Sequence, residues 1–376
     1  MPRPISVVIS SQALRHNIDA VLQHLESTSQ EAGVPRPKAW AVIKANAYGH
    51  GVEIAVSAFE HADGLAMLDF DEAVKCRDAG WTKPILLLEG FFEPADLELV
   101  QALSLTVAIH SPHQLDMLER ARITRPIDVF LKMNSGMNRL GFAPADYASA
   151  WARAEALRAE KKIATIGKMS HFARADDDVL VSLEQKKVFE QASQGLGEGP
   201  FSLCNSAGIY RPELWTSTAV AGEQWVRPGL CLYGCSPLPD RSAVSIDLQP
   251  VQTLQAELLS VRDISPGEAI GYGHLFVASE PMRMGVVACG YGDGYPRLIG
   301  ANTPITVDDV ATRIVGRVSM DMLTVDLTDI PQAQPGSRVV MWGEGGPSVD
   351  VIAACANTIG YDLMCTVAPR VPRIIT

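Results

Sequence analysis

The chain has 376 residues, of which 47% are hydrophobic and 20% charged, and its formal net charge is −11. This is globular composition with ample length for a large core, either as two domains or as one barrel with an appendage. The acidic balance and the lack of a basic stripe argue against nucleic acid or an anionic membrane surface as a partner. No apolar stretch is long enough for a membrane span or a signal peptide, so we expect a cytoplasmic protein.

The first half of the chain alternates short apolar segments with amphipathic ones. A helix is predicted over 11–25, where apolar residues recur on one face. Eight apolar segments follow, most of them separated by segments of helical character. We expect strands at 40–44, 64–68, 84–90, 105–110, 127–133, 166–172, 201–206 and 225–234. This alternation predicts an α/β fold that begins with a parallel (β/α)8 barrel of TIM type. An open doubly wound sheet is the alternative, but no G-x-G-x-x-G motif follows an early strand.

The alternation stops near residues 236–240, and from Gln249 onward apolar strands follow one another with turn residues between them. This pattern predicts a mostly antiparallel C-terminal β domain with one helix over 349–358. We therefore divide the chain into a barrel over 1–240 and a β domain over 241–376, and we allow for residues 1–10 packing on the β domain. The seven cysteines form no C-x-x-C pair, which predicts buried reduced thiols and no metal site.

Polar and cationic residues stand where several of the predicted barrel strands end. Because chemistry in such barrels sits at the C-terminal ends of the strands, we expect these side chains to share one site. Burial lowers the pKa of a lysine, so Lys44 is a candidate nucleophile that can bond covalently to a carbonyl carbon. Cations gathered in an acidic protein predict an anionic ligand, and Ser206 and Gly229 would suit a phosphate. The strand-end residues are Lys44, Lys132, His171, Asn205, Ser206 and Arg227.

Three further segments combine glycine with polar or aromatic residues. The segment KMNSGMNRLGF (132–142) carries Arg139, whose guanidinium could bind a carboxylate through two hydrogen bonds. The segment GYGHLF (271–276) exposes Tyr272 between two glycines. The loop CGYGDGYPR (289–297) lacks the lysine and the spacing of a P-loop. Tyrosines in such turns are usually packing residues, so these segments alone do not define a function.

Taken together, these segments resemble the alanine racemase family from about residue 4 to the C-terminus. The resemblance rests on the joint order of AVIKANAYGHG, SGMNRLGF, HFA, NSAG, VRPGLCLYG, GYG, GYGDGYPR, SMD and RVPR. It implies a pyridoxal 5'-phosphate enzyme that interconverts L-alanine and D-alanine. It also implies a homodimer whose active site is shared across the interface, and a role either in supplying D-alanine for peptidoglycan or in alanine catabolism.

The resemblance implies roles for individual residues as well. Lys44 would hold the cofactor covalently and act as one of two bases, and Tyr272 would act as the other from the partner subunit. Arg227 would contact the pyridine nitrogen, and His171 would link Arg227 to the tyrosine. The other implied cofactor-binding residues are Tyr48, Asn205, Ser206, Gly229, Leu230 and Tyr361.

The family pattern places Arg139 and Met320 at the substrate. Lys132 falls where family members often carry a carbamylated lysine, an anion that orients the arginine. The channel leading to the site would be lined by Asp176, Arg297, Arg317 and Ile359. The chain departs from many relatives at Asn134, where they have aspartate, and from some at Ser319, where they have cysteine. Neither departure affects a catalytic role, although the first alters the charge near Lys132.

Three other classes of protein are alternatives to an alanine racemase. A racemase of broader substrate range would be expected to be exported and to lack a lysine at position 132. A non-enzymatic pyridoxal-phosphate carrier would lack the β domain that contains Tyr272. A decarboxylase of the same architecture would place a carboxylate against the pyridine nitrogen, where this chain has Arg227. These differences favour alanine racemisation.

Overall fold

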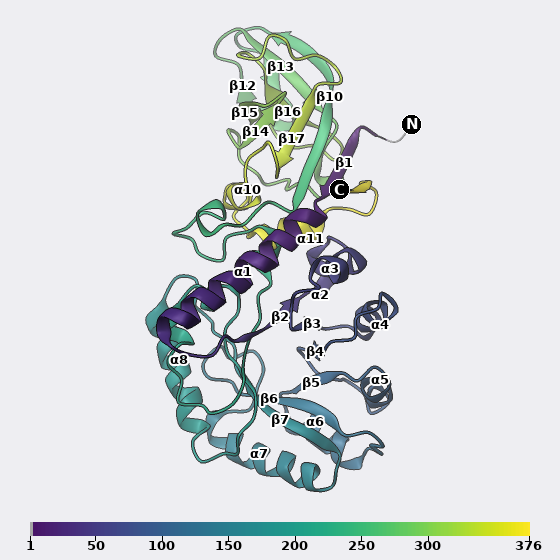
Figure 1. The fold of residues 1–376 in the computed structure, drawn as a ribbon. Coiled ribbons are helices and arrows are strands. Elements are labelled where there is room, and N and C mark those ends of the chain that lie inside the picture. The colour runs from purple at the N-terminus through teal and green to yellow at the C-terminus, as the bar shows by residue number, and fades with distance from the viewer. Residues whose placement is uncertain (1–2) are drawn as a thin grey trace.

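The computed structural model describes residues 3–376, and it confirms a barrel followed by an antiparallel sheet (Figure 1). Eight parallel strands, β2 to β9, pair in sequence order, and β9 closes the barrel by pairing with β2. Each strand places its carboxyl end at the same mouth of the barrel. The strands are β2 (Lys38–Val42), β3 (Gly64–Met67), β4 (Ile85–Leu87), β5 (Thr106–Ile109), β6 (Ile127–Lys132), β7 (Ile163–Met169), β8 (Phe201–Ser202) and β9 (Gln224–Val226).

Helices join most of these strands and surround the barrel. Helix α1 (Ser11–Ala32) is capped by Ser10, whose hydroxyl accepts the Ala13 N–H. It runs beyond the predicted end at residue 25, and its C-cap is Gly33, where φ is 66°. The left-handed C-cap is typical of glycine. The other helices are α2 (Lys44–Tyr48), α3 (Val52–Ala58), α4 (Phe70–Asp78), α5 (Asp96–Ala102), α6 (Pro112–Arg120), α7 (Pro144–Ala159), α8 (Val179–Ala192) and α9 (Ser206–Ile209), with short 3-10 turns η1 (Pro212–Leu214), η2 (Leu230–Tyr233) and η3 (Val244–Ile246).

The barrel strands are apolar on both faces because one face fills the interior and the other packs on helices. All four residues of β3 are buried. Gly64 within β3 makes room for a large neighbour, since a Cβ there would lie 2.3 Å from the ring of Trp40. The aromatic core of the barrel therefore depends on a missing side chain at this position.

The β domain contains an eight-stranded sheet in the order β13-β16-β15-β14-β17-β10-β1-β18. The long strand β10 pairs with β1, β13 and β17, so it connects the two halves of the sheet. A separate hairpin, β11 with β12, carries the turn η4. The elements are β10 (Gln252–Ile264), β11 (Ala269–Ile270), η4 (Tyr272–His274), β12 (Phe276–Val277), β13 (Met282–Val287), η5 (Tyr291–Asp293), β14 (Pro304–Val307), β15 (Val310–Val315), β16 (Leu323–Asp326), β17 (Arg338–Trp342), α10 (Val349–Cys355) and α11 (Gly360–Thr366).

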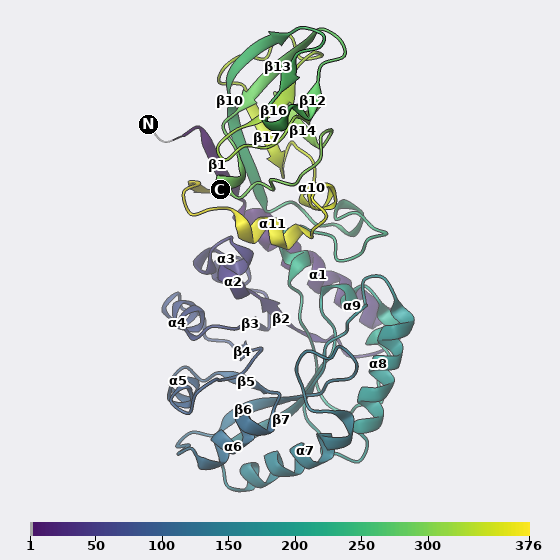
Figure 2. The same ribbon diagram turned by 180° about the vertical axis from the view of Figure 1, so that it is seen from behind.

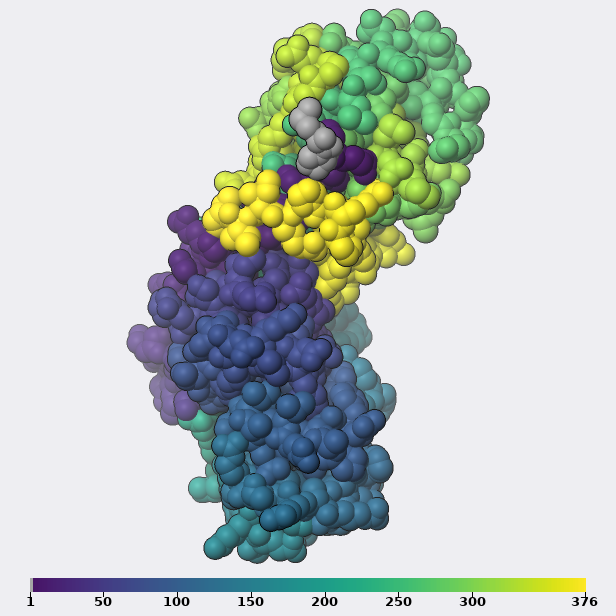
Figure 3. All heavy atoms as spheres, turned by 90° about the vertical axis from the view of Figure 1, so that its right-hand side faces the viewer, coloured from purple at the N-terminus to yellow at the C-terminus, as the bar shows by residue number. Residues whose placement is uncertain are grey.

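Both ends of the described chain enter this sheet. Strand β1 (Ile5–Ile9) pairs antiparallel with β10 and parallel with β18 (Arg373–Ile375). Residues 5–9 therefore belong to the sheet of the β domain, although the barrel follows them in the sequence. Helix α11 lies between the sheet and the barrel (Figure 2), and the C-terminal segment forms a band across the junction (Figure 3).

Several predicted elements have other ends in the structure, and in two places the chain follows a different course. The segment predicted as a strand over 225–234 is extended only to Val226, because Pro228 has no N–H for a ladder and the chain then turns into η2. The helix predicted over 349–358 ends at Cys355, and α11 follows it as a second helix. Five of the seven cysteines are buried free thiols, whereas Cys355 and Cys365 are exposed. Within residues 3–376, no helix is long and apolar enough to cross a membrane.

Candidate active site

Lys44 follows β2 at the mouth of the barrel, and the residues after it form a left-handed turn. Ala45, Asn46, Ala47 and Tyr48 have φ values of 54°, 53°, 52° and 53°. A left-handed helical conformation costs about 1–2 kcal/mol for each residue that carries a Cβ. Four such residues in succession therefore need support from their surroundings.

Hydrogen bonds from neighbouring elements supply that support. The Glu72 carboxylate, in the first turn of α4, accepts the Asn46 N–H at 2.6 Å. The buried ring of His50 contacts the Ala47 carbonyl through Nδ1 at 2.8 Å. These bonds fix the backbone on either side of Ala47, and so they fix the directions in which the Lys44 and Tyr48 side chains leave it.

Positive charge is concentrated at this mouth. Burial, followed by the nearby Arg139 guanidinium, lowers the pKa of Lys44. Burial, followed by Arg227 and Arg139, lowers the pKa of Lys132 to about 8. Glu89 opposes the lowering of the pKa at both lysines. The arrangement raises the neutral fraction of both amines above that of a lysine in water, and the neutral amine is the nucleophilic form.

Arg227 is buried, and neutral groups hold it in place. Its guanidinium donates to the Ser170 carbonyl at 2.7 Å, to the Leu203 carbonyl at 3.0 Å and to the Ser202 hydroxyl. It also contacts Nδ1 of His171 at 3.2 Å. Burial lowers the pKa of Arg227 to about 10, which still leaves it charged at neutral pH. A buried charge held only by neutral dipoles favours an anion beside it.

The contact with Arg227 determines the tautomer of His171. A guanidinium has donors and no acceptor, so Nδ1 must accept and the ring proton must reside on Nε2. Burial, and then the neighbouring cations with Arg227 first, lower the pKa of His171 well below its usual value. The imidazole is therefore neutral, and its Nε2–H can donate to another group at the mouth.

A second cluster surrounds the start of α9 and η2. The Asn205 side chain caps α9, and the Ser206 hydroxyl accepts the Gly229 N–H at 2.8 Å. A Cβ at Gly229 would lie 2.7 Å from the Tyr48 hydroxyl, so a glycine allows the tyrosine to reach this turn. The Tyr361 ring meets the Tyr48 ring edge-on at 6.2 Å. The hydroxyls and the backbone amides of this cluster suit a phosphate. Leu230, the remaining predicted residue here, begins η2.

The other predicted site residues in the β domain lie apart from this cluster. The side chains of Tyr272 and Met320 are 72% and 54% exposed. Among residues 3–376, no hydrogen bond or ion pair joins Tyr272 to Lys44 or His171.

The four predicted channel residues fall into two groups. Asp176 and Ile359 lie near the phosphate-suited cluster. Burial raises the pKa of Tyr361, and the negative charge of Asp176 raises it further. Ile359 immediately precedes α11, the helix that contains Tyr361. Arg317 lies beside the turn that carries Tyr272, and Arg297 lies 6.0 Å from the ring centroid of Tyr291.

Three side chains near the site were not among the predicted residues. Glu89 is the residue before the last in the predicted strand 84–90, and His110 ends the predicted strand 105–110, so the strand-end position that singled out Lys44 could also have indicated them. Burial, followed by Lys132, lowers the pKa of His110. Glu72 contacts the turn only through a backbone amide, and no sequence pattern predicts such a contact.

The geometry is that of a barrel whose mouth carries a lysine of lowered pKa among cations, an arrangement that suits an anionic ligand with a carbonyl group. The comparison with known families is more specific. The alanine racemase N-terminal domain matches residues 9–237, and the alanine racemase C-terminal domain matches residues 251–375. The chain therefore belongs to the alanine racemase family of isomerases.

Individual relatives match over nearly the whole chain. The alanine racemase of Bordetella petrii is 54% identical over 373 residues, covering 99% of both chains, and that of Burkholderia mallei is 50% identical over 374 residues with the same coverage. The crystal structure of the biosynthetic alanine racemase from Pseudomonas aeruginosa has a TM-score of 0.90 at 39% identity, covering 100% of this chain and 99% of that one. The alanine racemase of Acinetobacter baumannii has a TM-score of 0.89 at 34% identity, covering 100% of both.

The lowered pKa of Lys132 predicts a pH-dependent stability. We expect Lys132→Met to stabilise the cofactor-free protein at neutral pH. Because the pKa is about 8 in the folded state and 10.5 ordinarily, folding disfavours the charged amine by about 3 kcal/mol. Below pH 8 both states are protonated and the whole penalty applies. Between pH 8 and 10.5 the folded state loses its proton first, and the advantage of the variant disappears.

Urea unfolding of both proteins from pH 6 to 10.5 measures this difference in the free energy of unfolding. Lys187→Met, which removes an exposed lysine on α8, serves as the matched control and should show no such trend. A stability difference for Lys132→Met that stays constant with pH would contradict the assignment.

Proposed function

We propose that this protein interconverts L-alanine and D-alanine with pyridoxal 5'-phosphate, using Lys44 and Tyr272 as bases on opposite faces of the substrate. The observation that carries the proposal is the half-buried Lys44, whose pKa is lowered, beside an excess of cations at a barrel mouth. A lysine of lowered pKa can attach covalently to an aldehyde. The neighbouring cations suit the negative charges of a phosphorylated cofactor and of an amino-acid carboxylate.

The described residues fit this cofactor. Ser206, Tyr48, Tyr361 and the amides of Gly229 and Leu230 would hold its phosphate, and the cap at Asn205 would keep that turn in place. When bound, the cofactor would withdraw electrons from the α-carbon of an attached amino acid and so acidify its α-hydrogen. Arg227 would donate a hydrogen bond to the ring nitrogen and keep its own proton, since its pKa of about 10 lies above neutral pH. This limits electron withdrawal and favours return of the proton to the same carbon.

Racemisation requires a proton to leave one face of the α-carbon and another to arrive on the opposite face. Lys44 would supply the base on one face of the α-carbon, from within the barrel. Tyr272 is exposed on the β domain of its own chain, so we propose that it serves the barrel of a second copy. The Nε2–H of His171 would then donate to the tyrosine oxygen and stabilise it when it gives up its proton.

Apolar exposure on the β domain supports a homodimer. The side chains of Tyr272, Leu275 and Val277, all in the β11–β12 hairpin, are 72%, 66% and 53% exposed. Exposed apolar clusters of this kind commonly mark an interface. We propose that this hairpin covers the barrel mouth of the partner. Asp176, Ile359, Arg297 and Arg317 would then line the channel to the shared site, the first two from the barrel side of the site.

At the substrate, we propose that Arg139 binds the carboxylate and that Met320 contributes from the partner. We also propose a cytoplasmic location, a division near residue 240, and a role either in supplying D-alanine for peptidoglycan or in alanine catabolism. These finer statements rest on the family resemblance.

The test of the activity is incubation of the purified holoenzyme with L-alanine in deuterium oxide. We expect D-alanine that carries deuterium at the α-carbon, without pyruvate or amine, as measured by chiral chromatography and proton NMR. Pyruvate or an amine as the main product would indicate another reaction. Cofactor binding without exchange of the α-hydrogen would favour a carrier, and faster exchange with serine would favour a broader-range racemase.

The two-base assignment predicts an asymmetric effect of Tyr272→Phe. The variant should lose abstraction of the α-proton from L-alanine by about 100-fold or more, since the removed group acts as the base on that face. Release of tritium from each labelled enantiomer measures the two half-reactions separately. Equal losses for L-alanine and D-alanine would argue against Tyr272 as the base for the L-enantiomer.

Lys132 gives a separate prediction. We propose that its neutral amine adds to carbon dioxide, forming an N–C bond and releasing one proton to solvent, and that the resulting carbamate pairs with Arg139. The cations around Lys132 would stabilise this anion. Supplying 13C-bicarbonate should produce a protein-bound carbamate carbon signal in NMR that Lys132→Arg lacks. The same signal in both proteins would place the modification elsewhere.

A further inference from the structure

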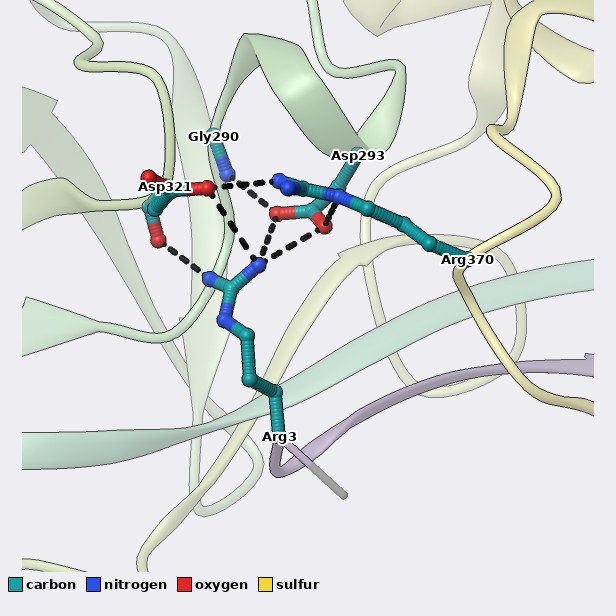
Figure 4. Close-up of polar contacts among 5 residues, drawn as sticks. All are labelled: Arg3, Gly290, Asp293, Asp321 and Arg370. Carbon is teal, nitrogen blue, oxygen red and sulfur yellow. Dashed lines mark hydrogen bonds and ion pairs between the residues drawn. The ribbon is translucent and has the colours of Figure 1, made fainter.

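A four-residue ionic network joins two loops of the β domain to the two ends of the chain (Figure 4). Asp293 is fully buried, and its carboxylate accepts from Arg3 Nη1 at 2.9 Å, from Arg370 Nε at 2.8 Å and from the Gly290 N–H at 3.0 Å. The same two arginines reach Asp321. Arg370 Nη2 lies 2.7 Å from its carboxylate, and Arg3 donates to its backbone carbonyl.

The network holds the two loops against each other. In the first loop, which contains η5, the Tyr291 N–H donates to the Ser319 carbonyl at 3.0 Å, and the Gly292 N–H donates to the Met320 carbonyl at 2.8 Å. Asp293 ends η5, and Asp321 follows Met320 directly. The ionic network therefore holds the two loops that carry Tyr291 and Met320, residues that are 38% and 54% exposed.

The same loops adjoin the turn that carries Tyr272. A Cβ at Gly271 would lie 3.6 Å from the backbone nitrogen of Arg317, and Arg317 begins the segment that continues to Met320. The exposed tyrosine, the exposed methionine and the loop around η5 thus form one continuous part of the β-domain surface. No hydrogen bond or ion pair among residues 3–376 joins this network to the cations at the barrel mouth of the same chain.

The ionic groups around Asp293 contribute to the orientation of the loops more than to stability. A buried ion pair often contributes no more stability than apolar residues of the same volume, because desolvation offsets the attraction. Its hydrogen bonds, however, are directional, and Asp293 uses both carboxylate oxygens on three donors. A carboxylate bound in this way fixes the orientation of the backbone that carries it.

We propose that Asp293 is a positioning residue that fixes Tyr291 and Met320 for the active site of the partner subunit, so that the network acts across the interface. This inference rests on the proposed racemase dimer. Misplacement of groups around a reacting substrate by about 1 Å can lower the rate about 100-fold. Asp293→Asn, which keeps the volume and removes the charge, should therefore lower kcat by about that factor while leaving the cofactor content unchanged.

The decisive experiment uses a mixed dimer. Two differently tagged chains are co-expressed, one with Lys44→Ala and the other with Asp293→Asn, and the mixed holoenzyme is purified through both tags. One of its two sites then combines an intact Lys44 with intact loops from the partner. We expect about half of the wild-type activity per dimer, since one of two equivalent sites is complete. Activity no greater than that of the Asp293→Asn homodimer would overturn the proposal, because the aspartate would then act within its own chain.

Two controls separate this inference from the proposed function. A mixed dimer of Lys44→Ala with Tyr272→Phe tests the shared site itself. If activity is restored in this mixed dimer but not in the one that carries Asp293→Asn, only the inference fails. If activity is restored in neither mixed dimer, the shared site and the inference fail together. Asp326→Asn removes a carboxylate that Arg313 binds at 3.0 Å in the same domain, away from both loops, and its homodimer should keep wild-type kcat. An equal loss of kcat in that variant would indicate a general effect of removing an ion pair.

A second readout needs no cofactor and no activity. Hydrogen exchange at the Tyr291 and Gly292 amides should be at least about 10-fold faster in Asp293→Asn than in the wild type, with the barrel amides unchanged. If Asp293→Asn does not fold, Arg370→Gln is used in the same mixed dimer, because Arg3 still pairs with the aspartate there. Unchanged exchange in the loops of a folded variant would overturn the proposal.

Discussion

The site depends on an excess of positive charge at one end of the barrel. Lys132 and Arg227 are buried there, Lys44 is half-buried and Arg139 is exposed. Glu89 is the carboxylate that influences both lysines. Repulsion and desolvation together lower the pKa of both lysines and keep His171 neutral, while Arg227 remains charged. The neutral, nucleophilic fraction of each amine is therefore larger than for a lysine in water at the same pH, and it lies beside a fixed cation. An anionic ligand would relieve the repulsion when it binds.

The site also depends on the backbone geometry of the left-handed turn after Lys44. Four residues that carry a Cβ adopt a conformation that each disfavours, and contacts from α4 and from His50 keep them there. The strain is located between the lysine that would bond to the cofactor and the tyrosine that would meet its phosphate. A rigid backbone at this place sets the distance between the two ends of the ligand.

Much of the barrel could be predicted from the sequence, because its strands are apolar runs and its candidate site residues follow them. The strand-end position identified Lys44, Lys132, His171 and Arg227 without any alignment. The left-handed turn could not be predicted, since 45–48 contains no glycine and propensity favours a right-handed turn there. The Asp293 network could not be predicted either. Its bond to Arg3 spans 290 residues of sequence, and only the pairing of β1 within the sheet brings the two together.

The position of β1 also determines the order in which the molecule can be completed during synthesis. Strand β1 leaves the ribosome before the barrel does, but its partner β10 begins only at Gln252 and β18 ends at Ile375. Until β10 has been synthesised, β1 has no hydrogen-bonding partner, although Val7 and Ile9 are fully buried in the finished protein. A nascent chain therefore carries an unpaired apolar edge for most of its synthesis, and such edges are prone to association with other chains. The sheet of the β domain is complete only when β18 has been synthesised and can pair with β1.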